Sequence, residues 1–261
     1  MFCRAILSIY LAHLLTDYIF QSHNLVAQKR NRTISAYAIH GIVHYLSAIA
    51  LTGFLIRGSI LSLRTHLVIL GLTLLHLLID FAKMELASRH HVFDGPAAYV
   101  SDQLLHLVTV FFAAWLLSPG VLFADMAQWI AYGRNLPNKF LAIPVIYIAI
   151  MFGGGYLIRF MTRSLAEGVK SHSPEKASEQ LQNAGLYIGW LERFLVVTFL
   201  LLHSPAAVGL ILTAKSIARY PEFKSEPFAE YFLIGTLLSI ALALVAGAIL
   251  SVLLFGHVQF A

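Results

Sequence analysis

The segment ILSIYLAHLLTDYIF, residues 6–20, places two ionisable side chains inside a run of apolar ones. A helix of about 20 apolar residues can cross a bilayer, and only His13 and Asp17 seriously interrupt this run. The two residues are four positions apart, so they share one face of a helix. The stretch HLLIDFAK, which begins at His76, repeats the same pattern. The sequence therefore predicts membrane helices that carry paired polar residues with a functional role.

The composition indicates an integral membrane protein. Of the 261 residues, 59% are hydrophobic and 12% are charged, whereas soluble domains have about 25% charged residues. The net charge of +5 is explained by basic loops that set membrane topology, so we predict no nucleic-acid partner. We expect the first apolar segment to be retained, because polar residues interrupt it and no small-residue cleavage site follows.

Apolar segments recur along the chain. Eight of them cover residues 4–21, 35–56, 64–86, 96–118, 141–161, 185–203, 206–218 and 229–255. The seventh is short for a full crossing. We therefore predict an all-α fold, a polytopic transmembrane bundle of about seven to eight helices. We divide it into a four-helix bundle with a metal site at 1–120 and a helical membrane extension at 121–261.

The distribution of Lys and Arg predicts the orientation. Nine of these residues flank the loops after the first, third and fifth segments, and five lie on the other side. Basic loops face the cytoplasm. We therefore expect a protein of the inner (cytoplasmic) membrane whose N-terminus lies on the side away from the cytoplasm.

Each of the first four segments carries a pair of metal-ligand residues at positions i and i+4. The pairs are His13 and Asp17, His40 and His44, His76 and Asp80, and Asp102 and His106. Such a pair can point at one centre, as in the HExxH zinc helix. The pairs alternate between the ends and the beginnings of successive helices, which run in opposite directions. All four should therefore lie at one depth, near the cytoplasmic side, and we predict all eight side chains as metal ligands.

The spacing of the pairs indicates a duplication. The first and third pairs are 63 residues apart, and the second and fourth are 62 apart. We therefore predict that helices 1–4 form two pseudo-repeated hairpins, related by an axis along the membrane normal.

The cost of intramembrane charge favours a metal. A central Asp costs about 2.5–3.5 kcal/mol on the insertion scale, and a divalent cation offsets this cost directly. Nitrogen and oxygen donors without thiolate suit zinc first, with iron, manganese or nickel as alternatives. Eight ligands exceed the need of one ion, so we predict two ions, or one ion with outer Asp–His pairs. A proton or ion relay and plain hydrogen bonding between helices remain the alternatives.

The motifs HLLTDYIFQ, HGIVHY, HLLIDFAK and DQLLHL resemble the bacterial membrane family catalogued as domain of unknown function 3307. Later stretches, GWLERFL, AKSIARYPEF and EYFLIGTLLS, look like a C-terminal extension of its longer members. The paired residues are also distantly similar to those of predicted membrane-bound metal-dependent hydrolases. These resemblances imply a metal site and do not name a substrate.

Three functions are consistent with this pattern. The first is an intramembrane metal-dependent hydrolase that acts on a membrane lipid or another lipid-linked, amphiphilic substrate, with Asp102 or His13 as general base or orienting group. The second is a divalent-cation or proton transporter, although the outer halves of the four helices are nearly all apolar, which favours a closed-ended site. The third is a metal-stabilised scaffold for an unknown protein partner. Lys83 could neutralise a phosphate or extend to the interface.

The second half of the chain contains a smaller set of charged residues in apolar surroundings. Glu192 and Arg193 lie in the sixth segment, and Lys215 lies in the seventh. We expect them to form buried ion pairs that connect this half to the first bundle, with a site for a substrate headgroup as the alternative.

Overall fold

The computed structural model describes residues 2–56, 62–90, 94–118, 139–172, 179–224 and 226–258. Within these ranges the chain is helical apart from short turns, and it contains no strand. Each of the eight predicted apolar segments is helical over most of its length. The all-α prediction is therefore confirmed.

Long apolar helices make this an integral membrane protein. Six helical stretches of the described ranges are long and apolar enough to cross a membrane, namely Phe2–Phe20, Ile34–Leu55, Leu63–Arg89, Pro96–Leu117, Lys139–Met161 and Glu226–Phe255. The chain divides into two compact units, Met1–Val145 and Ile146–Ala261. The predicted boundary at residue 120 lies outside the described residues and stays a prediction.

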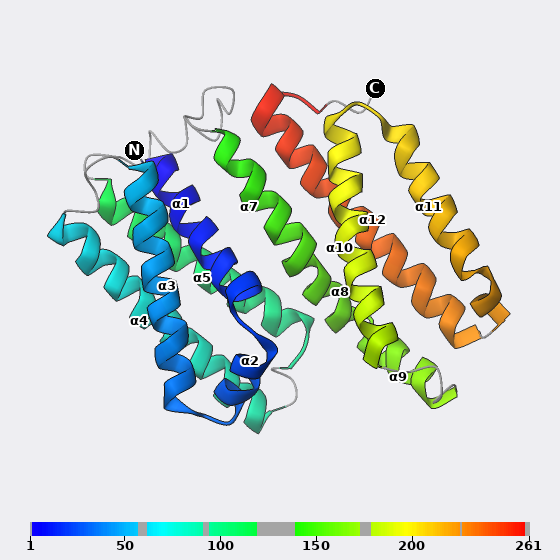
Figure 1. Cartoon of the computed structure of the whole chain (residues 1–261), viewed down its shortest axis with the longest axis horizontal. Helices are drawn as coiled ribbons and strands as arrows, with labels where there is room; N and C mark the ends of the chain where they lie inside the picture. Colours follow the sequence, from blue (N-terminus) through cyan, green and yellow to red (C-terminus); the bar gives the residue numbers. More distant parts are fainter. Residues whose placement is uncertain are drawn as a thin grey trace. The chain divides into compact units, whose positions relative to one another are not determined.

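Four long helices dominate the first unit (Figure 1), and because each packs against two of the others they form a closed ring. It comprises α1 (Phe2–Leu15), the π-helical turn η1 (Thr16–Phe20), the short α2 (His23–Arg30), α3 (Ile34–Leu55), α4 (Leu63–Arg89) and α5 (Pro96–Leu117). Helix α1 packs against α3 and α5, and α4 packs against the same two helices. Each helix therefore presents one face to a shared interior. The relation between the two hairpins as repeats stays a prediction.

Local sequence explains how α1 ends and how α2 and α5 begin. The hydroxyl of Thr16 donates to the Ala12 carbonyl at 2.8 Å, and the helix widens into η1 at this point. Such π-helical turns are frequent at functional sites. Ser22 then caps α2 by accepting from the Leu25 amide at 3.3 Å, and Pro96 occupies the first turn of α5, where its missing N–H costs nothing.

An apolar core fills one half of the four-helix ring. It consists of Phe2, Cys3, Ala5, Ile9, Ala12, Ala48, Ile56, Ile69, Leu72, Val110, Ala113, Ala114 and Leu117. These residues come from α1 up to Ala12, from the first half of α4, from the second half of α5, and from the second half of α3 and the residue that follows it. The other half of the interior is left for the polar pairs. On the outer faces, large aliphatic side chains such as Ile42, Leu67 and Leu78 are 59–61% exposed, as lipid contact requires.

The first unit ends with the 3₁₀ turn η5 (Lys139–Leu141) and the first residues of α7 (Ala142–Ile148), and the second unit begins within α7. The second unit continues with η6 (Ala149–Gly153), α8 (Gly154–Met161), α9 (Arg163–His172), α10 (Glu179–Leu201), α11 (Pro205–Arg219), the 3₁₀ turn η8 (Tyr220–Lys224) and α12 (Glu226–Phe255). Helix α12 packs along α10 and contacts α8 and α9, and α11 packs on α10. The short α11 corresponds to the predicted seventh segment.

Candidate metal centre

The four predicted pairs meet in the half of the first unit that the apolar core leaves open. All five histidines are 1% exposed. The side chains of Asp17 and Asp80 are 15% and 14% exposed, and Asp102 is 5% exposed. The contacts described below connect α1, η1, α3, α4 and α5 at this level. The four pairs therefore lie together at one level of the bundle, and the predicted position of this level near the cytoplasmic side stays a prediction.

One group of donor atoms surrounds Asp17. Its Oδ1 lies 3.4 Å from both His40 Nε2 and His76 Nε2, and these two nitrogens are 2.9 Å apart. Asp80 Oδ2 lies 3.5 Å from His40 Nε2 and 3.7 Å from His76 Nε2. A tetrahedral ion with bonds of 2.0–2.1 Å requires donor atoms about 3.3 Å apart. The spacing of this group therefore fits a small divalent cation.

A close approach of two helices brings this group together. A Cβ at Gly41 would lie 2.8 Å from Leu77 Cδ1. The glycine therefore lets α3 pack tightly against α4. This approach places His40, the residue before Gly41, next to His76.

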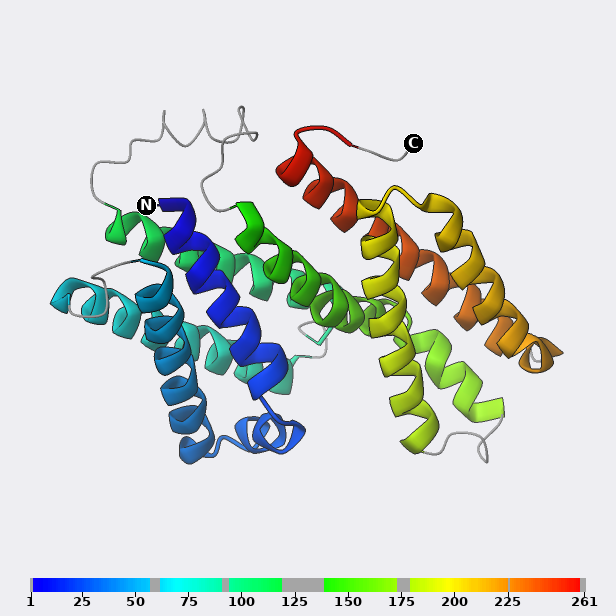
Figure 2. The ribbon, with the colours of Figure 1, turned by 45° about the horizontal axis from the view of Figure 1, so that its top comes forward.

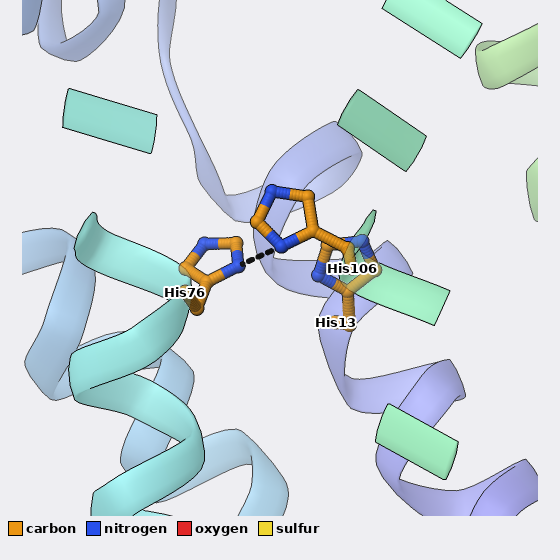
Figure 3. Close-up of side chains that lie close together, drawn as sticks. All are labelled: His13, His76 and His106. Carbon is orange, nitrogen blue, oxygen red and sulfur yellow. Dashed lines mark hydrogen bonds between the residues drawn. The ribbon is translucent and has the colours of Figure 1, made fainter. Parts of the chain in front are cut away.

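A second group of donor atoms surrounds His106. Its Nε2 lies 3.5 Å from Asp80 Oδ1 and 3.6 Å from Asp102 Oδ1. Its Nδ1 lies 3.1 Å from Nδ1 of His76 (Figure 3). Asp80 therefore turns one oxygen towards each group, and the two groups adjoin.

His13 reaches the same cluster from α1. A ring nitrogen from each of His13, His76 and His106 lies within 4.8 Å of the others, and Figure 3 shows the three rings gathered from α1, α4 and α5. Asp17, His76, Asp80 and His106 likewise offer one atom each within 4.8 Å of one another. This buried His/Asp cluster could hold a metal ion.

Several atoms of the cluster have unmet hydrogen-bonding capacity. Both ring nitrogens of His13, Oδ1 of Asp17, Oδ1 of Asp102 and Nε2 of His106 are buried without a hydrogen-bond partner. An unmet buried donor or acceptor costs about 1–3 kcal/mol. A neutral imidazole offers one nitrogen lone pair and each carboxylate oxygen offers its own, and a cation would engage these acceptors, so the donor set fits a metal ion.

His44 occupies a different position in the cluster. Its Nδ1 lies 3.2 Å from Thr73 Oγ1, and its ring stacks on that of His76 with centroids 4.3 Å apart. His44 thus buttresses one face of His76. Its predicted role as a ligand stays a prediction.

Lys29 is a site residue that sequence reasoning missed. It comes from α2, at the end of the bundle where η1 ends and α3 begins (Figure 2). The side chain is fully buried and donates to Asp80 Oδ2 at 2.6 Å and to Gln21 Oε1 at 3.3 Å. Lys29 and Asp80 are 51 residues apart, so no local pattern signals this pair.

Lys83 forms a matching pair on the other side of the cluster. It donates to Asp102 Oδ2 at 2.7 Å, and its side chain is 32% exposed. Gln103 donates to the same oxygen at 3.1 Å and accepts from the Tyr18 hydroxyl at 3.1 Å. These contacts fix Asp102 so that its Oδ1 remains towards His106.

The charged residues of the second unit form a separate polar layer. Lys215 donates to Glu192 Oε2 at 2.7 Å, and Arg193 donates to Ser239 Oγ at 3.2 Å and to the Met151 carbonyl at 2.7 Å. The ion pair that we expected exists, but it joins α10 to α11 inside the second unit. The expectation that this pair connects the two halves was wrong.

Comparison with known families identifies the first half of the chain. Residues 6–132 match the family model described as "Protein of unknown function (DUF3307)". The match covers just under half of the chain, and over these residues the chain is similar to the DUF3307 family. The resemblance drawn from HLLTDYIFQ and its companion motifs is confirmed, and all eight predicted ligands lie within the DUF3307 segment. No curated protein and no solved structure matches the chain. The likeness to metal-dependent hydrolases stays a prediction.

Proposed function

We propose that the DUF3307 segment binds at least one divalent cation inside the membrane and hydrolyses an amphiphilic substrate with it. The observation that carries the proposal is the buried cluster of nitrogen and oxygen atoms at ligand spacing, five of which have no hydrogen-bond partner. Imidazole and carboxylate donors without thiolate suit zinc, and iron, manganese or nickel are the alternatives.

The residues of the two groups have different roles in this proposal. Asp17, His40 and His76 hold the cation, with Asp80 and His106 beside them. A bound divalent cation makes water nucleophilic near neutral pH and polarises the substrate oxygen. Asp102 Oδ1 is 3.6 Å from His106 Nε2, and the other oxygen of this carboxylate is held by Lys83 and Gln103. Asp102 is therefore suited to accept a proton from the attacking water.

The surroundings of the cluster favour an enzyme over a conduit. On one side, the apolar core closes the interior of the bundle. On the other side, Asp17, Asp80 and Lys83 retain some exposure at the bundle end. A transport path would need polar groups on both sides. A substrate with an apolar tail can instead place its polar group at the open end while its tail stays in the lipid.

Elemental analysis of the purified protein in detergent tests the metal. We expect stoichiometric metal in the wild type, and a loss of metal affinity of about tenfold or more in Asp17→Asn and His76→Ala. His23→Ala is the matched control, because His23 is an exposed histidine of the same unit. Asp102→Asn should keep its metal but lose hydrolysis of an amphiphilic ester or phosphoester. A wild-type protein without stoichiometric metal, or full activity in His76→Ala, would contradict the proposal.

A further inference from the structure

The charges of the cluster do not balance once a cation binds. Three carboxylates, those of Asp17, Asp80 and Asp102, face the two ammonium groups of Lys29 and Lys83. With neutral imidazoles the cluster therefore carries one excess negative charge. One divalent cation changes this to one excess positive charge, and a second cation would make it larger.

The two lysines decide the sign of the loaded site. Without them, three carboxylates and one divalent cation would leave a negative site, which would repel an anionic substrate. With them, the loaded site is positive, and a buried charge without a counter-charge is costly. A neutral ester would leave this charge uncompensated, whereas an anionic group on the substrate would neutralise it.

The positions of the lysines are suited to a group with several oxygens. Lys29 holds Asp80 Oδ2, and Asp80 Oδ1 faces His106 Nε2. On the other side, Lys83 holds Asp102 Oδ2, and Asp102 Oδ1 faces the same nitrogen. The two ammonium groups thus flank the donor atoms around His106. Lysines and a cation around one group form the arrangement that stabilises phosphoryl oxygens.

Both lysines have hydrogen-bonding capacity for a ligand. An ammonium group has three N–H donors. Lys29 uses two for Asp80 and Gln21, and Lys83 uses one for Asp102. Arg32 and Arg89, which are 61% and 68% exposed, lie at the same end of the bundle, where both pair with Glu85. This basic rim would attract an anionic headgroup.

We propose that the hydrolysed group is a phosphate ester, and that Lys29 and Lys83 bind its non-bridging oxygens beside the cation. This inference rests on the proposed function. In the reaction, the water oxygen bonds to phosphorus and the bond between phosphorus and the ester oxygen breaks. One water proton passes by way of Asp102 to the departing alcohol, and the other stays on the phosphate.

Binding of substrate-like anions tests this inference. The metal content of each sample is measured first, and the metal-loaded protein in neutral detergent is then titrated calorimetrically with inorganic phosphate, dodecyl phosphate and the neutral ester dodecyl acetate. We expect phosphate compounds to bind the wild type and dodecyl acetate to bind at least tenfold more weakly. Lys29→Gln and Lys83→Gln should keep their metal and bind dodecyl phosphate about tenfold more weakly, equivalent to about 1.4 kcal/mol. The control Lys215→Gln removes a lysine–carboxylate pair in the second unit and should bind like the wild type.

Each outcome separates the inference from the proposed function. If dodecyl phosphate binds more tightly than inorganic phosphate, the site recognises a phosphate carried by a lipid tail. If the two bind equally, the site recognises the phosphate group alone. Both results support the inference. If the metal-loaded lysine variants bind phosphate like the wild type, the phosphate inference is wrong and the metal site stands. The same conclusion follows if the wild type binds dodecyl acetate as tightly as dodecyl phosphate. A wild type without metal would overturn the proposed function and the inference with it. If Lys29→Gln does not fold, the partly exposed Lys83→Gln decides the question.

Discussion

The two units of this protein bury polar side chains in different ways. In the first unit, histidines and aspartates gather with lone pairs in excess, and both ring nitrogens of His13 have no hydrogen-bond partner. In the second unit, Lys215 pairs with Glu192, and Arg193 donates to a hydroxyl and to a backbone carbonyl. The unpartnered atoms of the first unit belong to imidazoles and carboxylates that lie together, whereas in the second unit the unpartnered atoms of this layer are one carboxylate oxygen, Glu192 Oε1, and one donor, Arg193 Nε.

This contrast shows that the kind of buried group, rather than burial itself, indicates a metal. The polar layer of the second unit has a single carboxylate among its described charged residues, that of Glu192. Lys215 donates to its Oε2, and its Oε1 is buried without a hydrogen-bond partner. The turn η6 supplies the carbonyl of Met151 to Arg193. Among the described residues, this layer holds no group of three metal-ligand side chains. The cluster of the first unit, by contrast, groups imidazole and carboxylate atoms that could hold a cation.

Removing the metal should therefore destabilise one unit and spare the other. At free metal a thousandfold above its dissociation constant, bound metal stabilises a folded state by about 4 kcal/mol. We expect a chelator to increase amide hydrogen exchange in α1, α3, α4 and α5 by a corresponding amount, and to leave α10 and α12 unchanged. Hydrogen exchange resolved by peptide provides the measurement, and re-addition of zinc is the control. Equal changes in both units would remove the distinction between them.

Breaking the ion pair of the second unit should lower the stability of the protein without changing its metal content. Glu192 is 3% exposed, so Lys215→Met leaves a buried carboxylate without its cation. Loss of one partner of a buried pair costs about 3 kcal/mol, which we expect as a lower unfolding temperature with unchanged metal content. The double variant Glu192→Gln with Lys215→Met should recover most of this loss, because no charge is left unpaired. A single variant as stable as the wild type would show that this pair contributes nothing.

The sequence predicted the features that depend on one helix at a time. Bilayer thickness dictates the length of apolar runs, so the helices were predictable, and the i, i+4 spacing placed each His/Asp pair on one face. The alternation of helix direction also predicted that the four pairs meet, but other contacts between distant parts of the chain were missed. The insertion of Lys29 requires α2 to fold back over the bundle end, and the π-helical turn at Thr16–Phe20 leaves no hydropathy signal.

The position of His44 was also out of reach of the sequence, and it provides the smallest of these tests. Pattern alone made His44 equivalent to His40, but the rotation of α3 about its axis turns His44 Nδ1 to Thr73 Oγ1 at 3.2 Å. Thr73→Val removes this hydrogen bond and keeps the shape of the side chain, so we expect a loss of about 1 kcal/mol in stability with full metal content. Thermal unfolding and elemental analysis of the same sample measure both effects. A large loss of metal in Thr73→Val would mean that His44 binds the cation directly. The metal site would then extend one turn of α3 beyond His40, further into the bundle than the contacts of the carboxylates reach.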